Sequence, residues 1–260
     1  MSPRESTAEI QKLAHTLGVE PARLSALADV PAADLRVLRA QIADALFEAD
    51  RPAFAKMAAL SKALPGSVAA KITEHALAPL LAARTAELVE PHRAVDMVSR
   101  MSDGYLADVS AALDPARAPE VIAQIPADRI ATIGAELARR KEWVVIGGFV
   151  AQISAGAMAA AVAGFDGEQL LRIGFVLDDK TRIDDIVALV TDAQIDEMLL
   201  AAEGQSLWTE LDDLLAHLGP QRAGRMRVRF GAAPAEVVSA TRAAAKSGAL
   251  SKAGLACLTA

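Results

Sequence analysis

Residues that commonly start helices recur at intervals of twelve along much of this chain. Pro79, Pro91 and Pro115 lie on one such grid, with Asp103 at the intervening step. Proline fits the first turn of a helix, where its missing N–H costs nothing, and aspartate fits the capping position. Only 12 of the 260 residues are proline, so the regular spacing is informative. The grid continues, with a few slips, at Pro126, Ser154, Asp166, Asp178, Thr191, Pro220 and Pro234.

Intervals this short leave room only for short helices. Such helices are marginal alone, because nucleation is costly and each helix buries little apolar surface. They become stable when they stack on neighbours of the same kind, and two successive helices form a unit of about 24 residues, which is typical of solenoid repeats. The spacing therefore predicts an all-α fold: a right-handed α-solenoid, or superhelix, of short helices.

The composition supports the same fold class. Hydrophobic residues make up 53% of the chain but aromatic residues only 3%, so alanine and leucine supply most of the apolar content. Both are strong helix formers, and β-branched residues form no strand-like runs. Two stretches carry apolar residues at the three-and-four spacing of a buried helix face: Leu106, Val109 and Leu113 in one, and Leu170, Ile173 and Leu177 in the other.

The first 64 residues differ from this pattern. Residues 7–18 and 21–29 are predicted to form two short helices, and a longer helix is predicted from Pro31 onward. We place a boundary near Pro65, where the regular spacing begins. The predicted organisation is an N-terminal helical segment, residues 1–64, packed on an α-solenoid formed by residues 65–260.

The 23 residues between Glu142 and Asp166 carry no charge and are long enough to cross a bilayer. They are rich in glycine and alanine, whereas lipid-facing spans need more Leu, Ile and Phe. Ser154 is a suitable N-cap, and the residues around it fit a turn between two helices. We therefore expect two buried helices and not an integral membrane protein. The N-terminus has no secretory signal, so a cytoplasmic location is expected.

Residues 113–130 contain a leucine-aspartate-proline step followed by a second proline step. Leu113, Asp114, Pro115, Ile125 and Pro126 carry this pattern. It resembles the helical repeats of the N-terminal cytoplasmic domain of MgtE-type magnesium transporters, over about residues 65–230. The resemblance implies a superhelical domain that senses magnesium through acidic surfaces. The chain departs from the family in lacking paired CBS segments and a transport domain, so transport is excluded.

Magnesium sensing, as this resemblance implies it, would need oxygen ligands, which hard cations prefer. Seven carboxylates lie within residues 178–197, but carboxylates spread over short helices are more often caps or part of a solvated face. We therefore expect no metal site and no cofactor. The seven are Asp178, Asp179, Asp184, Asp185, Asp192, Asp196 and Glu197.

The N-terminal hairpin has helix-turn-helix spacing, with Ala14, Gly18, Leu24 and Leu27 at the small, turn and core positions. DNA binding would need basic residues on the second helix, and that helix offers only Arg23. The net charge of -6 also disfavours nucleic acid as a partner. A structural helical hairpin is the preferred interpretation.

Four arginines are close together near the C-terminus: Arg222, Arg225, Arg227 and Arg229. They form a candidate contact surface for an anionic partner, such as an acidic protein surface. The alternative is that they pair with the chain's own surplus of acidic residues.

Aromatic residues are concentrated in the central repeats. Trp143, Phe149, Phe165 and Phe175 fill core gaps in the simplest interpretation, and line a pocket for a hydrophobic small molecule in the alternative one. Alanine-rich helices leave space between them, which favours cavities.

No sequence motif of a nucleophile elbow, a P-loop, a dinucleotide fingerprint or a zinc site occurs, so no catalytic residues and no enzyme activity are expected. The leading hypothesis is a non-catalytic binding or scaffolding module that engages a protein partner through its concave or C-terminal basic surface. The second hypothesis is a carrier or sensor of a hydrophobic small molecule. DNA binding and magnesium sensing are lesser alternatives.

Overall fold

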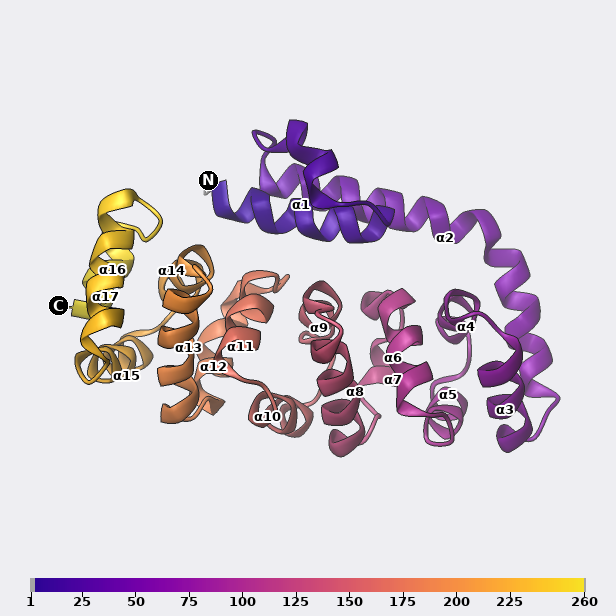
Figure 1. Ribbon diagram of the computed structural model, residues 1–260. Helices are drawn as coiled ribbons and strands as arrows, with labels where there is room; N and C mark the ends of the chain where they lie inside the picture. Colours follow the sequence, from indigo (N-terminus) through magenta and orange to yellow (C-terminus); the bar gives the residue numbers. More distant parts are fainter. Residues whose placement is uncertain (1–2, 260) are drawn as a thin grey trace. The chain divides into compact units, whose positions relative to one another are not determined.

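The computed structural model describes residues 3–259, and every regular element in that range is a helix, with no strand among them. The chain divides into two compact units, residues 1–161 (unit 1) and residues 162–260 (unit 2). Figure 1 shows the short helices of both units packed against their neighbours. The prediction of an all-α fold made of short helices is confirmed, and the right-handed superhelix stays a prediction.

Unit 1 begins with a helical hairpin and one long helix, followed by short helices. Their bounds are α1 (Pro3–Leu17), η1 (Pro21–Leu27), α2 (Ala32–Lys62), α3 (Gly66–Ala76), α4 (Pro79–Ala86), α5 (Pro91–Val98), α6 (Asp103–Ala112), η2 (Pro115–Arg117), α7 (Pro119–Ile122), α8 (Ala127–Arg139), α9 (Trp143–Phe149) and α10 (Ala155–Ala163).

Unit 2 continues with helices of seven to thirteen residues, apart from one short 3₁₀ turn. Their bounds are α11 (Gly167–Phe175), η3 (Lys180–Arg182), α12 (Ile183–Leu189), α13 (Asp192–Gly204), α14 (Trp208–Ala216), α15 (Pro220–Gly231), α16 (Ala235–Ser247) and α17 (Lys252–Thr259).

Helices in each unit pack mainly on the helix two places further along the chain. In unit 1, α2, α4, α6 and α8 follow one another in one row, and α3, α5 and α7 form a second row. In unit 2, α11, α13, α15 and α17 form such a row. The helices α4, α6 and α8 begin at residues 79, 103 and 127, so one two-helix unit spans 24 residues, as the spacing predicts.

The predicted helix starts are confirmed at almost every step of the grid. Prolines 79, 91 and 220 are the first residues of their helices, and prolines 126 and 234 directly precede theirs. Asp166 and Thr191 each form a capping box with the glutamine three residues later. Two steps are displaced by a residue. Asp179, not Asp178, caps η3 through the N–H of Thr181, and Ser102, not Asp103, caps α6 through the N–H of Tyr105.

The uncharged stretch forms two helices, as expected, because α9 ends at Phe149 and α10 begins at Ala155. The Ser154 hydroxyl accepts the Ala157 N–H at 3.2 Å and so caps α10. No helix among the described residues is long and apolar enough to span a membrane.

The N-terminal region differs from the prediction in one detail, because residues 21–27 form a 3₁₀ helix. The predicted long helix is α2, which continues through Pro52 to Lys62. The predicted boundary near Pro65 falls between α2 and α3.

Long-range capping bonds tie the rows together. Several side chains donate to the last carbonyls of a helix about 30 residues earlier, where such carbonyls have no partner within their own helix. Arg93 donates to Ser61 and Leu64, Tyr105 to Thr73 and Leu77, Arg129 to Val98 and Met101, and Gln194 to Val162 and Phe165.

Carboxylate side chains cap the N-terminal ends of helices over similar distances along the chain. Each accepts a backbone N–H at the start of another helix, where the helix dipole favours negative charge. Glu74 accepts from Ser102, Glu87 from Asp114, Asp184 from Gly219, Glu197 from Gly167, and Asp212 from Ser251.

Candidate functional site

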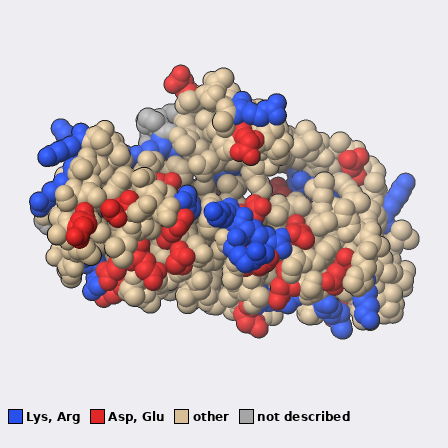
Figure 2. Space-filling model, viewed as in Figure 1, with Lys and Arg blue, Asp and Glu red and all other residues tan. Residues whose placement is uncertain are grey.

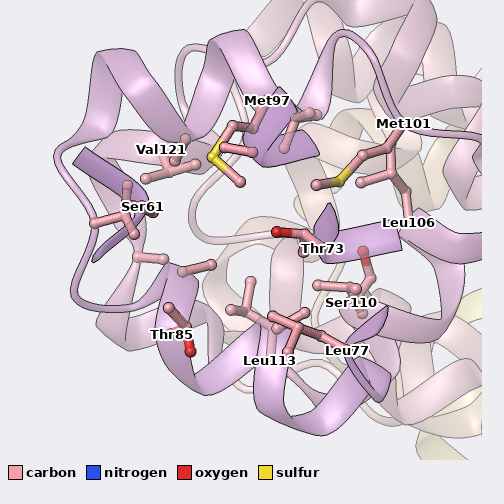
Figure 3. Close-up of a pocket in the computed structure, with 18 of the residues that line it drawn as sticks. Ser61, Thr73, Leu77, Thr85, Met97, Met101, Leu106, Ser110, Leu113 and Val121 are labelled. Carbon is pink, nitrogen blue, oxygen red and sulfur yellow. The ribbon is translucent and has the colours of Figure 1, made fainter. Parts of the chain in front are cut away.

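The interior of unit 1 contains a cavity of about 260 Å³ between its two rows of helices. Figure 3 shows side chains from several helices surrounding this open space. Residues from the C-terminal half of α2 and from every helix α3 to α9 contribute to its lining. The apolar stripe predicted on residues 106–113 faces this space, since Leu106, Val109 and Leu113 all line it.

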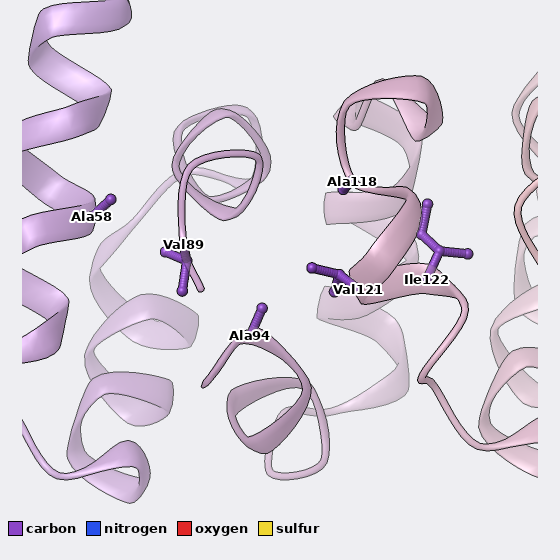
Figure 4. Packing of buried hydrophobic residues seen from close by; sticks show 6 residues of the cluster. All are labelled: Ala58, Val89, Ala94, Ala118, Val121 and Ile122. Atoms are coloured by element: carbon purple, nitrogen blue, oxygen red, sulfur yellow. The ribbon is translucent and has the colours of Figure 1, made fainter. Parts of the chain in front are cut away.

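Short side chains contribute to the cavity. Alanines 69, 82, 86, 94 and 118 occupy lining positions, where they fill less space than the Leu, Ile, Val and Met side chains beside them. Ala58, Val89, Ala94, Ala118, Val121 and Ile122 form the hydrophobic cluster of Figure 4. All of them except Ala58 also line the cavity, so one wall belongs to the packed core.

The lining is almost entirely apolar, and none of the lining side chains is charged. Three methionines lie on it: Met97 and Met101 are buried, and Met57 is half-buried. Methionine side chains are flexible and polarisable, so they adapt to ligands of different shape. The only polar side chains on the wall are the hydroxyls of Ser61, Thr73 and Thr85 and, on α6, Ser110.

Two lining residues are exposed to solvent, one in the last turn of α2 and one on α3. Leu60 and Ile72 both line the cavity, and yet they are 70% and 47% exposed. The remaining lining residues are buried or half-buried. Since α3 packs chiefly on α5, the α2–α3 gap is the natural entrance.

A buried ion-pair network supports the wall behind α4. The side chain of Glu87 is fully buried, and it accepts from Arg84 at 3.0 Å and from the Asp114 N–H at 3.2 Å. Burial raises the pKa of the Glu87 carboxyl above its ordinary value of 4.5, and these hydrogen bonds and the nearby arginines oppose the rise. Arg117 stacks over the Phe47 ring, 4.1 Å from its centroid, and thereby joins α2 to the repeats.

Of the four aromatic residues predicted to line a pocket, Phe149 lines this cavity. Trp143 lies half-buried on the same helix, α9, and is not among the lining residues. Phe165 and Phe175 are buried in unit 2. The structure therefore does not bring the four together at one site.

The sequence-based hypothesis was centred on the aromatic residues, and two of these four, Phe165 and Phe175, lie C-terminal to the residues that line this cavity. The relevant signal was their scarcity: between Phe54 and Trp143 the only aromatic residue is Tyr105. Five alanines lie on the lining beside larger aliphatic side chains, and Phe149 is the one aromatic residue among the lining residues.

The four candidate arginines all lie on α15 and are half-buried. Arg225 pairs with Asp192 at 2.6 Å, and Arg229 pairs with Asp196. The Nε atoms of Arg222 and Arg227 are buried and make no hydrogen bond within the described residues. Figure 2 shows basic and acidic side chains interspersed on the face it presents. Internal pairing with the chain's own acids thus accounts for two of the four.

The acidic stretch 178–197 is used in capping and ion pairing. Asp179 and Asp184 cap helix starts, Asp192 and Asp196 pair with arginines, and Glu197 accepts the Gly167 N–H at 3.1 Å. Within residues 3–259 no group of three or more His, Cys, Asp or Glu side chains is placed to hold a metal ion.

The N-terminal hairpin packs its apolar residues inward. Leu24 and Leu27 lie against a buried cluster of Ile10, Leu13 and Leu35, and Gly18 adopts a positive φ of 63° at the turn. The second element is the 3₁₀ helix, which is shorter and narrower than the α-helix that a DNA major groove accepts.

No protein-family model, no curated protein and no solved structure matches this chain. The resemblance to the MgtE repeats therefore stays a prediction.

Proposed function

We propose that unit 1 binds a small hydrophobic molecule in the cavity between α2 and α9, and that the protein is a carrier or sensor of that molecule without a chemical step. The observation that carries this proposal is the apolar cavity of about 260 Å³ with an entrance at Leu60 and Ile72. It corresponds to the second hypothesis from the sequence, with the site moved toward the N-terminus.

The energetics favour occupation. An unfilled apolar space destabilises a fold, because the atoms that line it lose packing contacts. Water is a poor filler, because a buried water molecule needs two to four polar partners and this lining offers few. An apolar ligand therefore stabilises the fold as it binds.

The volume sets the ligand size. An apolar cavity of about 150 Å³ accepts a benzene molecule, so a volume of 260 Å³ accommodates about ten non-hydrogen atoms. n-Butylbenzene has this size and carries no polar group, so it is a suitable probe.

The test is a calorimetric titration of the full chain with n-butylbenzene. We expect saturable binding at one site, and at least tenfold weaker binding in Ala94→Leu, whose longer side chain occupies the cavity. Ala135→Leu makes the same change at an exposed position of α8 outside the lining and should bind like the wild type. Absence of saturable binding, or equal binding by both variants, would refute the proposed function.

The protein-partner hypothesis stays a prediction. Its strongest sequence support was the arginine cluster, and the pairing of Arg225 and Arg229 within unit 2 leaves less free charge for a partner. Reversal of Arg222 and Arg225 to Glu tests it, since it predicts loss of affinity for an acidic protein surface.

A further inference from the structure

Among the described residues, two hydroxyls on the cavity wall, those of Thr73 and Ser110, lack the hydrogen bond that most hydroxyls on the helices of this protein make. Threonine in a helix commonly donates to the carbonyl four residues earlier, as Thr16, Thr132, Thr241 and Thr259 do. Within residues 3–259 the hydroxyls of Thr73 and Ser110 have no hydrogen-bond partner, although both residues line the cavity. By contrast, Ser61 donates to the Ala58 carbonyl at 2.8 Å, and the Thr85 hydroxyl lies 3.9 Å from Met57 Sδ.

The two hydroxyls lie on the same side of the cavity. In Figure 3 the Thr73 oxygen points into the open space, and Ser110 is drawn on the same side of the view, away from Ser61 and Thr85. The helices that carry them are linked, because the Tyr105 hydroxyl of α6 lies 2.8 Å from the Thr73 carbonyl oxygen and 3.1 Å from the Leu77 carbonyl oxygen of the α3 end. Of the four hydroxyls on the wall, the two that have no hydrogen-bond partner among the described residues are thus carried by helices that a hydrogen-bonded tyrosine links.

We infer that the ligand is an uncharged molecule of about ten non-hydrogen atoms with one hydroxyl or carbonyl group, which hydrogen-bonds to Thr73 and Ser110 while its hydrocarbon part fills the rest of the cavity. This inference rests on the proposed function. A hydroxyl side chain both donates and accepts, so it suits an alcohol, an ether, an ester or a ketone.

Charged ligands of the same size are excluded by the same lining. A buried ammonium or carboxylate needs an opposite charge or several hydrogen bonds to offset its lost hydration, and no charged side chain lines the cavity. Two neutral hydroxyls do not meet that need.

Three isosteric probes test the inference, because they differ only at the end of one chain. n-Butylbenzene ends in a methyl group, 3-phenylpropan-1-ol in a hydroxyl, and protonated 3-phenylpropan-1-amine in an ammonium group. Thr73→Val replaces the protein hydroxyl by a methyl group of the same shape. The affinity of each probe is measured by calorimetry for the full-length wild type and each variant.

We expect Thr73→Val to weaken binding of the alcohol about fivefold, the value of one ordinary hydrogen bond, and to leave binding of n-butylbenzene unchanged or stronger. Ser110→Ala should act in the same direction. Thr132→Val, at an exposed position of α8, is the matched control and should change neither. The ammonium probe should not bind.

The results separate the two proposals. If Thr73→Val and Ser110→Ala each change the affinity for the alcohol and for n-butylbenzene equally, the inference is overturned. Binding of the ammonium probe would also overturn it. In both cases the proposed function stays intact. If n-butylbenzene fails to bind the wild type, the proposed function itself fails. Binding of n-butylbenzene by each variant also shows that the variant is folded, and Ser110→Ala provides the test if Thr73→Val is unfolded.

Discussion

The two units build similar stacks of short helices but fill them differently. Nine of the twelve largest fully buried side chains belong to unit 2, and the exceptions are Leu13, Leu35 and Ile122. Unit 1 is the larger unit, yet its repeats are lined by alanines and enclose a cavity. Helix spacing and capping therefore set the architecture. The size of the inward side chains decides whether the interior of the stack is close-packed or encloses a cavity.

The two tryptophans make this comparison measurable. Trp143 lies in unit 1 and Trp208 in unit 2, and they are the only tryptophans of the chain. Trp208→Phe therefore leaves a fluorescence signal from unit 1, and Trp143→Phe leaves one from unit 2. Denaturant titrations of these two backgrounds report the stability of each unit.

The largest expected effect is a truncation in the filled interior. Leu171 in unit 2 is fully buried, so Leu171→Ala should lower the free energy of unfolding of unit 2 by about 2–5 kcal/mol. Leu106 in unit 1 is 4% exposed but borders the cavity, where it makes fewer contacts, so Leu106→Ala should cost less, near the lower end of that range. Equal losses in denaturant titrations would argue that unit 1 is as tightly packed as unit 2.

Replacing a buried alanine by leucine should change stability in opposite directions in the two units. Ala94→Leu fills cavity space and should stabilise unit 1 by about 1 kcal/mol. Ala202 in unit 2 is fully buried among large side chains, so Ala202→Leu should destabilise unit 2 by about 1–3 kcal/mol through overpacking. Thermal melts of the single-tryptophan backgrounds measure both changes, and destabilisation of unit 1 by Ala94→Leu would contradict the difference between the units.

The stability of unit 1 should depend on the protonation of Glu87. Burial raises its pKa above 4.5, so the folded state binds this proton more tightly than the unfolded state. The resulting stabilisation is present below pH 4.5 and is lost as the pH rises through the folded pKa. We expect the wild type to lose stability relative to Glu87→Gln on going from pH 4.5 to neutral pH.

Glu136 is the control, with the opposite sign. Hydrogen bonds from Arg139 and Arg140 lower the pKa of Glu136 to about 2, so its contribution is present above pH 4.5 and is lost as the pH falls toward 2. Stability curves of the wild type and Glu87→Gln that run parallel above pH 4.5 would show that Glu87 does not titrate differently in the folded state.

The smallest effects are expected at surface ion pairs, which should not distinguish the units. Arg225→Ala in unit 2 removes the half-buried partner of exposed Asp192, and Lys62→Ala in unit 1 removes the exposed partner of exposed Glu90. Each should change stability by less than about 1 kcal/mol, and the change should shrink further in 1 M salt. A larger loss at Arg225 would mean that the arginine surface holds unit 2 together.

Local rules explain how much of this molecule was predictable. Proline, aspartate, serine and threonine at helix starts act within one turn, so the residues that begin α4, α5, α10, α11, α13 and α15 could be identified from the sequence. The starts of α9 and α14 carry no such side-chain cap: the residues before them are Glu142 and Leu207, and both helices begin with tryptophan.

The cavity was not predictable in its position, for a physical reason. An unfilled space depends on which side chains from helices far apart in sequence face one another, here from α2 to α9. Aromatic residues indicate where large groups lie, but Phe165 and Phe175 fill the core of unit 2 and only Phe149 reaches the cavity. The caps from Arg93, Arg129 and Gln194 could not be predicted either, because each joins residues about 30 positions apart in the sequence.

Both proposals require that unit 1 holds an apolar space open to small apolar molecules. Xenon binds apolar cavities without needing any polar group, so a crystal of the full chain pressurised with xenon tests this requirement directly. We expect a xenon peak between Met97, Leu106 and Phe149, and none at that place in Ala94→Leu. Hydrogen-bonded water filling the site, or xenon bound only outside unit 1, would contradict it.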